Sequence, residues 1–370
     1  MRPAPPRRAD AAPAASLSSG AVDLIALGSV FVEVVFGHVP ALPRPGEEVF
    51  ADEFGLSCGG AVTAASAASQ AGARAGLAAV LGDDLGSRVV TEHCRRAGVD
   101  LSPSRRVSGR SAGISVVLNF DGDRAFITYL PPRHRPGTKH WHEVLRSYRP
   151  AWCYLHPGPG VARLLRAARS LGIRVALDVN LEEIAAYPAT VLSCARLADL
   201  FLPNEEELLR LARASSLRAA LGAAAEWCPV TVVKRGAGGA VVVSREAVTE
   251  VTHGVEQVTV RDRTGAGDSF AGALIAALCR GVPVTGAVAA ANTAGSQAVS
   301  RLGAVGEVDM AGLLGTAGPL AAAGVLSAAH GAAAAPGNPA GSAPGPGGPG
   351  GASAPAGSGT GTRSRTDDER

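Results

Sequence analysis

The chain has 370 residues, a formal net charge of +3 at pH 7 and 46% hydrophobic residues. This length is enough for one large α/β domain or two small domains with a buried core. The positive charge is spread along the chain without a basic stripe, which argues against a nucleic acid partner. Six cysteines stand singly, without a Cys-x-x-Cys pair, as expected for reduced thiols in a cytoplasmic protein.

The two ends of the chain differ in composition from its middle. Residues 1–20 are rich in Pro, Ala and Arg and lack the apolar core of a signal peptide, so we expect a disordered extension. Residues 315–370 are mostly Ala, Gly, Pro and Ser, which predicts a disordered tail. Residues 317–334 are weakly apolar, but Pro319 argues against a membrane span. A folded domain is therefore expected over residues 21–314.

Within this domain the hydrophobic pattern alternates between short strands and helices. The expected strands cover residues 22–28, 75–81, 152–155, 175–177, 198–202, 230–233 and 239–243. The expected helices cover residues 61–71, 89–97, 161–171, 205–213, 217–227, 268–280 and 284–300. Such alternation predicts an α/β fold with a central, mostly parallel sheet flanked by helices. In such sheets a ligand binds beyond the carboxyl ends of the strands.

Two segments do not follow this alternation. A hairpin is expected where residues 113–120 and 124–130 flank the turn Asp121-Gly122-Asp123, and residues 36–50 read as extended chain. We expect these β pieces, from about residues 36–58 and 105–130, to form a small lid that projects from the sheet and covers a site. The alternative is an ordinary surface hairpin.

The turn Thr264-Gly265-Ala266-Gly267-Asp268 precedes a long apolar helix. Its glycines let the backbone approach a ligand, and the free N–H groups of the first helical turn can bind an anion. Asp268 would repel a phosphate but could accept the proton of a hydroxyl that attacks one. The alternative is a capped helix start without chemistry. The turn has neither the Lys-Ser/Thr of a Walker A loop nor the third glycine of a dinucleotide-binding motif.

Together with the motifs at 204–207 and 234–239, residues 262–270 resemble the signature of the ribokinase-like (PfkB) family of carbohydrate and nucleoside kinases. The resemblance covers essentially residues 21–314. It implies that Asp268 is the catalytic base and that the N–H groups of Gly265, Ala266 and Gly267 stabilise the transferring phosphoryl group. It also places Thr264, Gly265 and Gly267 at ATP and Asp262 at a monovalent-cation site for K⁺. Arg263 departs from the usual Thr beside the nucleotide phosphates.

Two further motifs resemble the family's nucleotide side. Asn204-Glu205-Glu206-Glu207 is similar to its Asn-x-x-Glu motif, which implies that Asn204 and Glu207 organise Mg²⁺, partly through water, and that Asn204 contacts ATP. The alternative is an Asn cap on a helix. The other motif, a turn after a Val-rich strand, implies ATP contacts by Lys234, Gly236 and Gly239. On the last helix Asn292 and Ser300 are candidates for the adenine side, with ordinary polar helix positions as the alternative.

The amino-terminal half resembles the family's substrate side. Glu33 stands where a Gly-x-x-x-x-Asp motif has its Asp, and Gly59-Gly60 resembles a Gly-Gly signature in which Ala64 replaces Asn. The resemblance implies that Glu33, Gly59, Gly60 and Asp268 contact the substrate. Asp178-Val179-Asn180 resembles an Asp-x-Asn motif near phosphates or substrate. Because Ala64 has no amide, the usual pattern of contacts to sugar hydroxyls cannot be assumed.

The sequence therefore predicts an ATP- and Mg²⁺-dependent kinase that phosphorylates a hydroxymethyl group of a small sugar or sugar-like molecule. The alternatives are a nucleoside kinase and a non-catalytic ligand-binding member of the fold. No membrane partner is expected. The resemblance also allows a homodimer that forms through the lid.

Overall fold

The computed structural model describes residues 22–120, 124–132 and 134–305. The extension predicted at 1–20 and the tail predicted at 315–370 lie outside these residues, as do the three turn residues 121–123 of the predicted hairpin. Within the described ranges no helix is long and apolar enough to cross a membrane.

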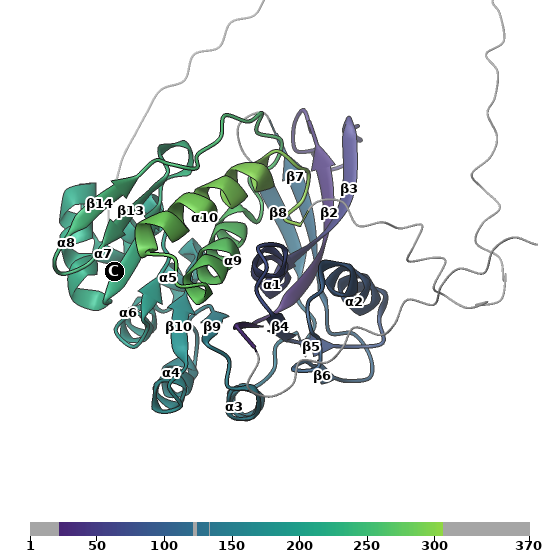
Figure 1. Ribbon diagram of the computed structural model, residues 1–370. Coiled ribbons are helices and arrows are strands. Elements are labelled where there is room, and N and C mark those ends of the chain that lie inside the picture. Colours follow the sequence, from purple (N-terminus) through teal and green to yellow (C-terminus); the bar gives the residue numbers. More distant parts are fainter. Residues whose placement is uncertain (1–21, 121–123, 133, 306–370) are drawn as a thin grey trace, which may run out of the picture. The chain divides into compact units, whose positions relative to one another are not determined.

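The main sheet has eight strands in the order β14-β13-β12-β11-β10-β9-β1-β4 (Figure 1). The six strands from β12 to β4 in this order are parallel to one another. Strand β13 pairs antiparallel with both β12 and β14. The predicted mostly parallel sheet is thus confirmed. The strands are β1 (Leu24–Leu27), β4 (Ala75–Ala78), β9 (Trp152–Leu155), β10 (Arg174–Leu177), β11 (Leu200–Phe201), β12 (Val230–Lys234), β13 (Ala240–Val243) and β14 (Val248–Val251).

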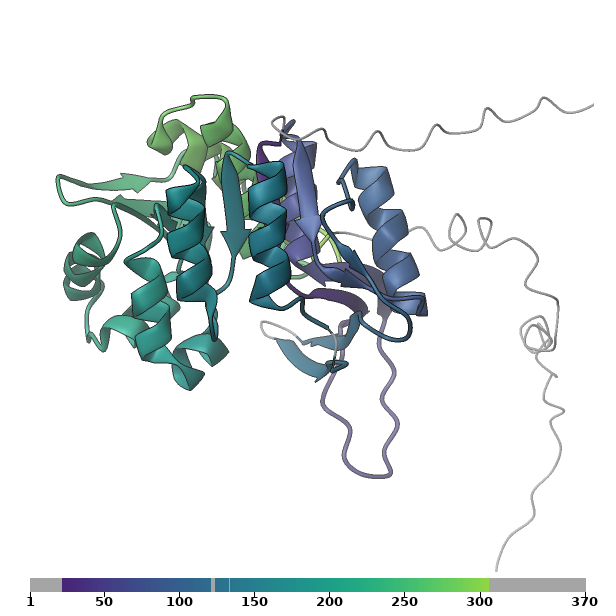
Figure 2. The same cartoon turned by 90° about the horizontal axis from the view of Figure 1, so that it is seen from below.

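Helices cover both faces of the main sheet because its buried strands are apolar on both sides. In β1, Leu24 and Ala26 enter one core, whereas Ile25 and Leu27 enter the other. The first core is closed by α1 (Ala61–Gln70), α2 (Leu85–Ala97), α9 (Ala266–Cys279) and α10 (Val284–Val299). The opposite face carries α3 (Thr138–Tyr148), α4 (Val161–Ser170), α5 (Leu181–Ala186), α6 (Pro188–Ala195), α7 (Glu205–Ala212) and α8 (Leu217–Trp227), several of which stand in front in Figure 2.

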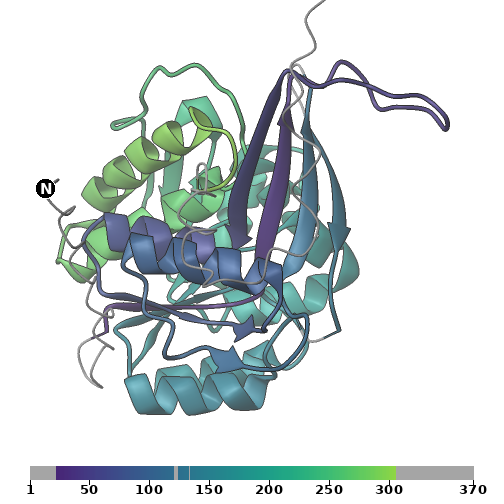
Figure 3. The same cartoon turned by 90° about the vertical axis from the view of Figure 1, so that its right-hand side faces the viewer.

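A second sheet of four strands stands away from the main sheet, as Figure 3 shows. Its order is β3-β2-β7-β8, with β2 (Val30–Gly37), β3 (Glu53–Gly60), β7 (Gly113–Asn119) and β8 (Arg124–Tyr129). The predicted hairpin is confirmed, because β7 and β8 pair antiparallel. Most of its strands fall within the residues predicted for the lid, and its role as a cover over a site stays a prediction.

The bounds predicted for the lid need two corrections. Only the first two residues of the extended segment 36–50 belong to a strand, and residues 38–52 hold none. Pro40, Pro43 and Pro45 lie in this loop, and proline has no N–H to donate to a sheet ladder. Residues 105–106 form β6, which pairs with β5 (Val80–Leu81) in a separate two-stranded sheet rather than in the second sheet.

Candidate active site

The predicted anion-binding turn forms the amino-terminal end of α9. Gly265 caps the helix with a left-handed φ of 73°, and a Cβ atom at this position would collide with Ala304. Only glycine fits such a conformation without strain. In the part of the chain that the structure describes, the N–H groups of Gly265 and Gly267 have no backbone acceptor. The turn therefore presents free donors at the positive end of a helix dipole.

A buried carboxylate braces the turn. Asp262 is 2% exposed, its Oδ1 accepts the N–H of Thr264 at 2.8 Å, and its Oδ2 accepts the N–H of Gly303 at 2.9 Å. The Thr264 hydroxyl is buried and has no hydrogen-bond partner among the described residues. An orphaned buried hydroxyl in this position is suited to a ligand that brings its own polar atoms.

Asp268 is half-buried in the first turn of α9 and meets side chains from the carboxyl ends of β9 and β10. The Tyr154 hydroxyl lies 2.5 Å from Asp268 Oδ1 and 3.2 Å from Asp178 Oδ2. Burial raises the pKa of Asp268, His156 opposes this rise, and Asp178 adds to it. The structure thus gives the predicted base a site in which ionisation is costly and neighbouring charges decide its protonation.

Lys234 at the end of β12 connects Asp178 to the turn. Its Nζ donates to both oxygens of Asp178, at 2.8 and 3.0 Å. A Cβ atom on Gly267 would lie 3.2 Å from the same Nζ, so the ammonium group is beside the anion-binding turn. Burial alone would lower the pKa of Lys234, but Asp178 and Glu207 raise it overall. A fixed positive charge therefore stands next to the free N–H groups.

His156 and Tyr154 were not among the predicted site residues. In the sequence Tyr154 reads as a core residue of a strand, and His156 follows that strand without a recognisable motif. The only usable signal was that polar residues at the carboxyl end of a parallel strand face the ligand edge. His156, Asp178 and Asp268 present ligand atoms within 4.8 Å of one another, a spacing that a metal ion could also use. Lys234 already neutralises Asp178, so the cluster is better described as an ion-pair network.

Glu33 lies on β2, on the face of the second sheet that it shares with Gly59 of β3. The carboxylate is 7% exposed, and its Oε2 accepts the N–H of Ala304 at 3.3 Å. A Cβ atom on Gly59 would collide with Glu33 Oε1, so a glycine is required beside this carboxylate. Burial raises the pKa of Glu33 to about 7, and the charges of Asp262 and Asp268 contribute to the rise. The structure therefore brings Glu33 within electrostatic reach of Asp268.

Gly60 and Ala64 have packing roles. Gly60 has a φ of 72°, and a Cβ atom there would lie 2.5 Å from the Ser29 carbonyl oxygen. Ala64 is fully buried in α1, where its carbonyl oxygen leaves no room for a side chain on Gly272 of α9. The residue that replaces the family's Asn, Ala64, therefore lies where α1 and α9 pack closely against each other.

Asn204 and Glu207 form the helix cap that was the alternative to a metal site. Asn204 Oδ1 accepts the N–H of Glu207 at 2.8 Å, and Glu207 Oε2 accepts the N–H of Asn204 at 2.7 Å. These reciprocal bonds start α7 as a capping box. Burial raises the pKa of Glu207 to about 7, against the opposing effect of Lys234. Within the described residues Glu207 Oε1 accepts no hydrogen bond, so magnesium coordination by this oxygen stays a prediction.

The remaining nucleotide-side candidates also have structural partners. Asn292 is buried, and its Nδ2 donates to the carbonyl oxygens of Val251 and His253 at 3.0 and 2.8 Å. The Ser300 hydroxyl donates to the Gln297 carbonyl oxygen. Gly239 has a φ of 76° and packs against Val251, whereas Gly236 has open space around it. Contacts within the protein therefore account for the presence of Asn292, Ser300 and Gly239 at these positions. The contacts with ATP that were predicted for them stay predictions.

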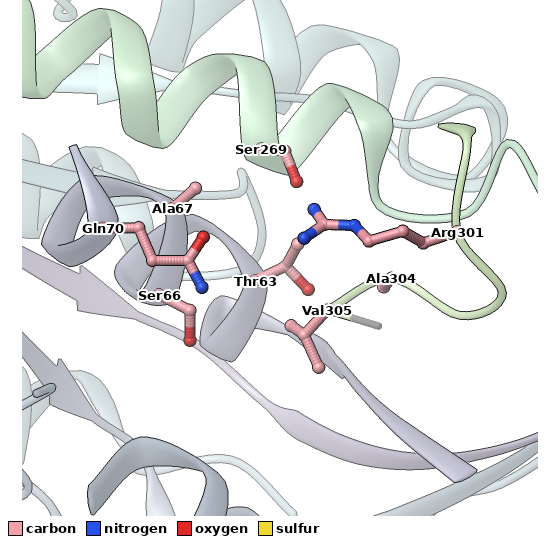
Figure 4. Close-up of a pocket in the computed structure, with 8 residues that line it drawn as sticks. All are labelled: Thr63, Ser66, Ala67, Gln70, Ser269, Arg301, Ala304 and Val305. Carbon is pink, nitrogen blue, oxygen red and sulfur yellow. The ribbon is translucent and has the colours of Figure 1, made fainter. Parts of the chain in front are cut away.

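A small cavity lies between α1, α9 and the segment 301–305 (Figure 4). Its volume of about 10 Å³ has room for one water molecule. Its lining includes the unpartnered Thr63 hydroxyl, and Ala304 joins it to the turn at Gly265. None of the predicted substrate residues lines it. The lining residues are Thr63, Ser66, Ala67, Gln70, Ser269, Arg301, Ala304 and Val305.

Known proteins resemble this chain over about two thirds of its length. The aminoimidazole riboside kinase of Salmonella typhimurium is 28% identical over 285 residues, which are 68% of this chain and 84% of that protein. The ribokinase of Mus musculus is 24% identical over 266 residues, which are 69% of this chain and 81% of that protein.

Solved structures have the same fold. The adenosine kinase from Sinorhizobium meliloti superposes with a TM-score of 0.67 at 20% identity, covering 77% of this chain and 96% of that one. A putative ribokinase II from E. coli in complex with ATP and Mg²⁺ gives a TM-score of 0.67 at 22% identity, covering 77% and 94%. The model of the pfkB family carbohydrate kinases matches residues 24–309. The chain therefore belongs to the pfkB family of carbohydrate kinases.

Proposed function

We propose that this kinase transfers the γ-phosphoryl group of ATP to a hydroxymethyl group of a small sugar or sugar-like molecule, with Asp268 as the base. The observation that carries the proposal is the place of Asp268 in the first turn of α9, next to the free N–H groups of Gly265 and Gly267. Asp268 Oδ1 accepts from Tyr154, which leaves Oδ2 to receive the proton of the attacking hydroxyl.

The nucleotide side of the site fits a phosphate chain and its metal. The free N–H groups of Gly265 and Gly267, the unpartnered Thr264 hydroxyl and the ammonium of Lys234 are donors suited to phosphate oxygens. The N–H of Ala266, the third donor we propose, donates to the Arg263 carbonyl oxygen at 3.5 Å and would have to leave it. Magnesium, held by Asn204 and Glu207 partly through water, would neutralise the charge of the phosphates. We place the phosphates of ATP at these donors.

On the substrate side, Glu33 would accept hydrogen bonds from substrate hydroxyls. It shares its face of the second sheet with Ser115, whose hydroxyl lies 2.6 Å from that of Thr128. Carboxylates and hydroxyls pair well with a polyhydroxylated molecule. These polar side chains, together with Asp268, support a small sugar as the phosphoryl acceptor.

The experiment that tests the base is ATP consumption over a panel of ribose, fructose, 2-keto-3-deoxygluconate, adenosine and cytidine. We expect Asp268→Asn to reduce kcat by about 10²- to 10⁴-fold, the usual contribution of a general base. Asp83→Asn is the matched control, because Asp83 is exposed and, among the residues that the structure describes, accepts only the N–H of Gly109. Full activity of Asp268→Asn would show that another group takes the proton.

The panel also separates the alternatives. The first relative named above is a riboside kinase and one structural neighbour is an adenosine kinase, which favours a nucleoside as the second candidate substrate. Thermal stabilisation by adenosine or cytidine, but not by the three sugars, would support a nucleoside kinase. Stabilisation by a panel member without ATP consumption would support a non-catalytic ligand-binding protein.

Activation by K⁺ is part of the proposal for Asp262. Both carboxylate oxygens of Asp262 already accept backbone N–H bonds, so any cation must share them. A higher rate in KCl than in NaCl of equal ionic strength would support a monovalent-cation site. Equal rates in the two salts would leave Asp262 with a structural role alone, as the acceptor of the two backbone hydrogen bonds.

A homodimer through the second sheet is also part of the proposal. The strand register places Phe54, Ile114, Ile127 and Tyr129 on the face opposite Glu33, and all four side chains are exposed. Phe54 also stacks with Phe36 at 5.7 Å between ring centroids. An exposed apolar sheet face of this kind is suited to contact with another protein surface. A second copy of the chain, presenting the same face, is the partner we propose.

A further inference from the structure

Two side chains at the end of β9 connect the proposed base to a second ion pair. Tyr154 is 1% exposed and lies two residues before His156, whose ring meets it edge-on at 5.9 Å between centroids. The Tyr154 hydroxyl is 2.5 Å from Asp268 Oδ1 and 3.4 Å from His156 Nε2. A single buried hydroxyl therefore stands between the carboxylate and the imidazole.

Glu183 fixes the other side of the imidazole. Its Oε2 lies 3.0 Å from His156 Nδ1 and also accepts the N–H of Asn180 at 3.1 Å. Asn180 Oδ1 in turn accepts the N–H of Glu183 at 2.8 Å, so the capping box of α5 holds the carboxylate in place. Because a carboxylate only accepts, Nδ1 carries the hydrogen of this bond. Nε2 is thereby directed towards Tyr154.

The charge of His156 follows from this environment. Burial alone would lower the pKa of His156, but Glu183, Asp178 and Asp268 raise it to about 9. At neutral pH both ring nitrogens therefore carry hydrogens. Nε2–H can then donate to the Tyr154 oxygen, and the single hydroxyl proton of Tyr154 goes to Asp268, the nearer of its two acceptors. Lys234 supplies donors to Asp178 in place of Tyr154.

We propose that Glu183, His156 and Tyr154 form a positioning relay, in which hydrogen bonds run from the imidazolium through the Tyr154 hydroxyl to Asp268 Oδ1. The relay rests on the proposed role of Asp268 as the base. It holds one carboxylate oxygen in place, leaves Oδ2 for the substrate hydroxyl, and puts a positive charge beside a carboxylate that must be ionised to accept a proton. Glu183, His156 and Tyr154 are thus positioning residues.

The relay counteracts several groups that disfavour ionisation of Asp268. Asp178 faces it from the end of β10 and adds a negative charge, and burial acts in the same direction. Lys234 from β12 opposes them, but it is bound to Asp178. Glu33 and Glu207 are the other acidic groups in electrostatic range of this network. His156 is the strongest opposing influence on Asp268, ahead of Tyr154 and Lys234.

The test is an NMR titration of the full chain without nucleotide or sugar, following the Asp268 carboxyl carbon and the His156 ring nitrogens. We expect His156→Gln to raise the titration midpoint of Asp268 by ~1 pH unit, the lower end of the effect of an opposite charge at this range. Tyr154→Phe raises the same midpoint. Glu183→Gln lowers the midpoint of His156 from about 9. The spectrum of Asp268→Asn identifies the carboxyl signal.

His142→Gln and Tyr148→Phe are the matched controls, because His142 lies outside the network and the Tyr148 hydroxyl donates to Ser102. Both should leave the Asp268 midpoint unchanged. An unchanged Asp268 midpoint in folded His156→Gln, or an unchanged His156 midpoint in folded Glu183→Gln, would overturn the relay. If Asp268→Asn retained full ATP consumption while the midpoints moved as expected, the relay would stand as an electrostatic network and the proposed base would fail. The two proposals can therefore fail separately.

Discussion

Single residues in this site combine burial with charge, which makes them useful for chemistry and costly for folding. Burial raises the pKa values of Glu33 and Glu207 to about 7 and also raises that of Asp268. Each of these carboxylates lies on an element that the folded core fixes in place. A folded protein that must ionise such groups loses stability as the pH rises.

Glu33→Gln tests this conflict between function and stability. The pKa of Glu33 is about 7 in the folded chain against an ordinary value of 4.5, so folding favours the protonated form. The wild-type chain therefore loses stability as pH rises from about 4.5 to 7, and the loss persists above that range. At pH 8 we expect the free energy of unfolding of the variant to exceed that of the wild type by on the order of 3 kcal/mol, because each unit of difference between the folded and unfolded pKa values is worth about 1.4 kcal/mol.

Urea unfolding at pH 4.5 and pH 8 measures the effect. The difference between variant and wild type should be small at pH 4.5 and large at pH 8. Glu226→Gln is the control, since Glu226 is exposed and only pairs with Arg245 at 3.8 Å. An equal difference at both pH values would contradict the raised pKa. If Glu33 contacts the substrate as proposed, the same variant should bind that substrate more weakly, because the amide cannot accept as two carboxylate oxygens do.

At the scale of elements, the turn before α9 is the part on which the site depends most. Its conformation relies on Gly265, whose φ is 73° and whose Cα packs against Ala304. Asp262 then joins the turn to Gly303. The N–H donors are presented to a ligand because the backbone is held from both sides.

Gly265→Ala should damage both the turn and the activity. The left-handed φ costs an alanine about 1–2 kcal/mol, and the contact with Ala304 adds to this cost. We expect a lower free energy of unfolding, measured in urea, together with a loss of kcat. Gly222→Ala in α8 is the matched control: a Cβ atom added there would have open space around it, and the variant should be more stable by about 0.5–1 kcal/mol. Equal stability of the two variants would contradict the strained turn.

The sequence predicted elements well where a strong period or a punctuating residue marked them. The hairpin of β7 and β8 followed from its Asp-Gly-Asp turn, and α4 from its apolar spacing. In contrast, β2 was not predicted. Glu33 interrupts its run of Val and Phe residues, and the extended chain was predicted at residues 36–50, most of which form the loop after β2. The short helices α5 and α6 were also missed. They meet at Tyr187, directly before Pro188, so neither is long enough to show a helical period.

At the scale of the whole molecule, one face of the second sheet carries the polar side chains of Glu33 and Ser115, and the other carries exposed apolar side chains. The residues alternate because successive side chains of a strand point to opposite faces. Glu33 and Ser115 therefore face the site, whereas Ile114 and Ile127 face away from it. One sheet can thus serve as both a cover for a substrate and a contact surface for a second copy.

Ile127→Lys tests the second role. Ile127 is 66% exposed on the apolar face, on the edge strand β8, and a lysine there would place like charges near each other in a symmetric dimer. We expect light scattering to give a dimer mass for wild type and a monomer mass for the variant. Val248→Lys is the control, because Val248 is exposed on β14 of the other sheet. A monomer mass for wild type would rule out the proposed dimer.

The sequence by itself determined the kind of fold and the chemistry of one turn. Alternating β and α patterns specify a parallel sheet, and Thr264–Asp268 specify a helix start with free donors and a carboxylate, because these are local properties of the chain. Only the tertiary structure decided what surrounds Asp268. Tyr154, His156, Asp178 and Lys234 lie at the carboxyl ends of β9, β10 and β12, and their convergence at one sheet edge depends on strand order. Strand order is a long-range property that no local pattern records.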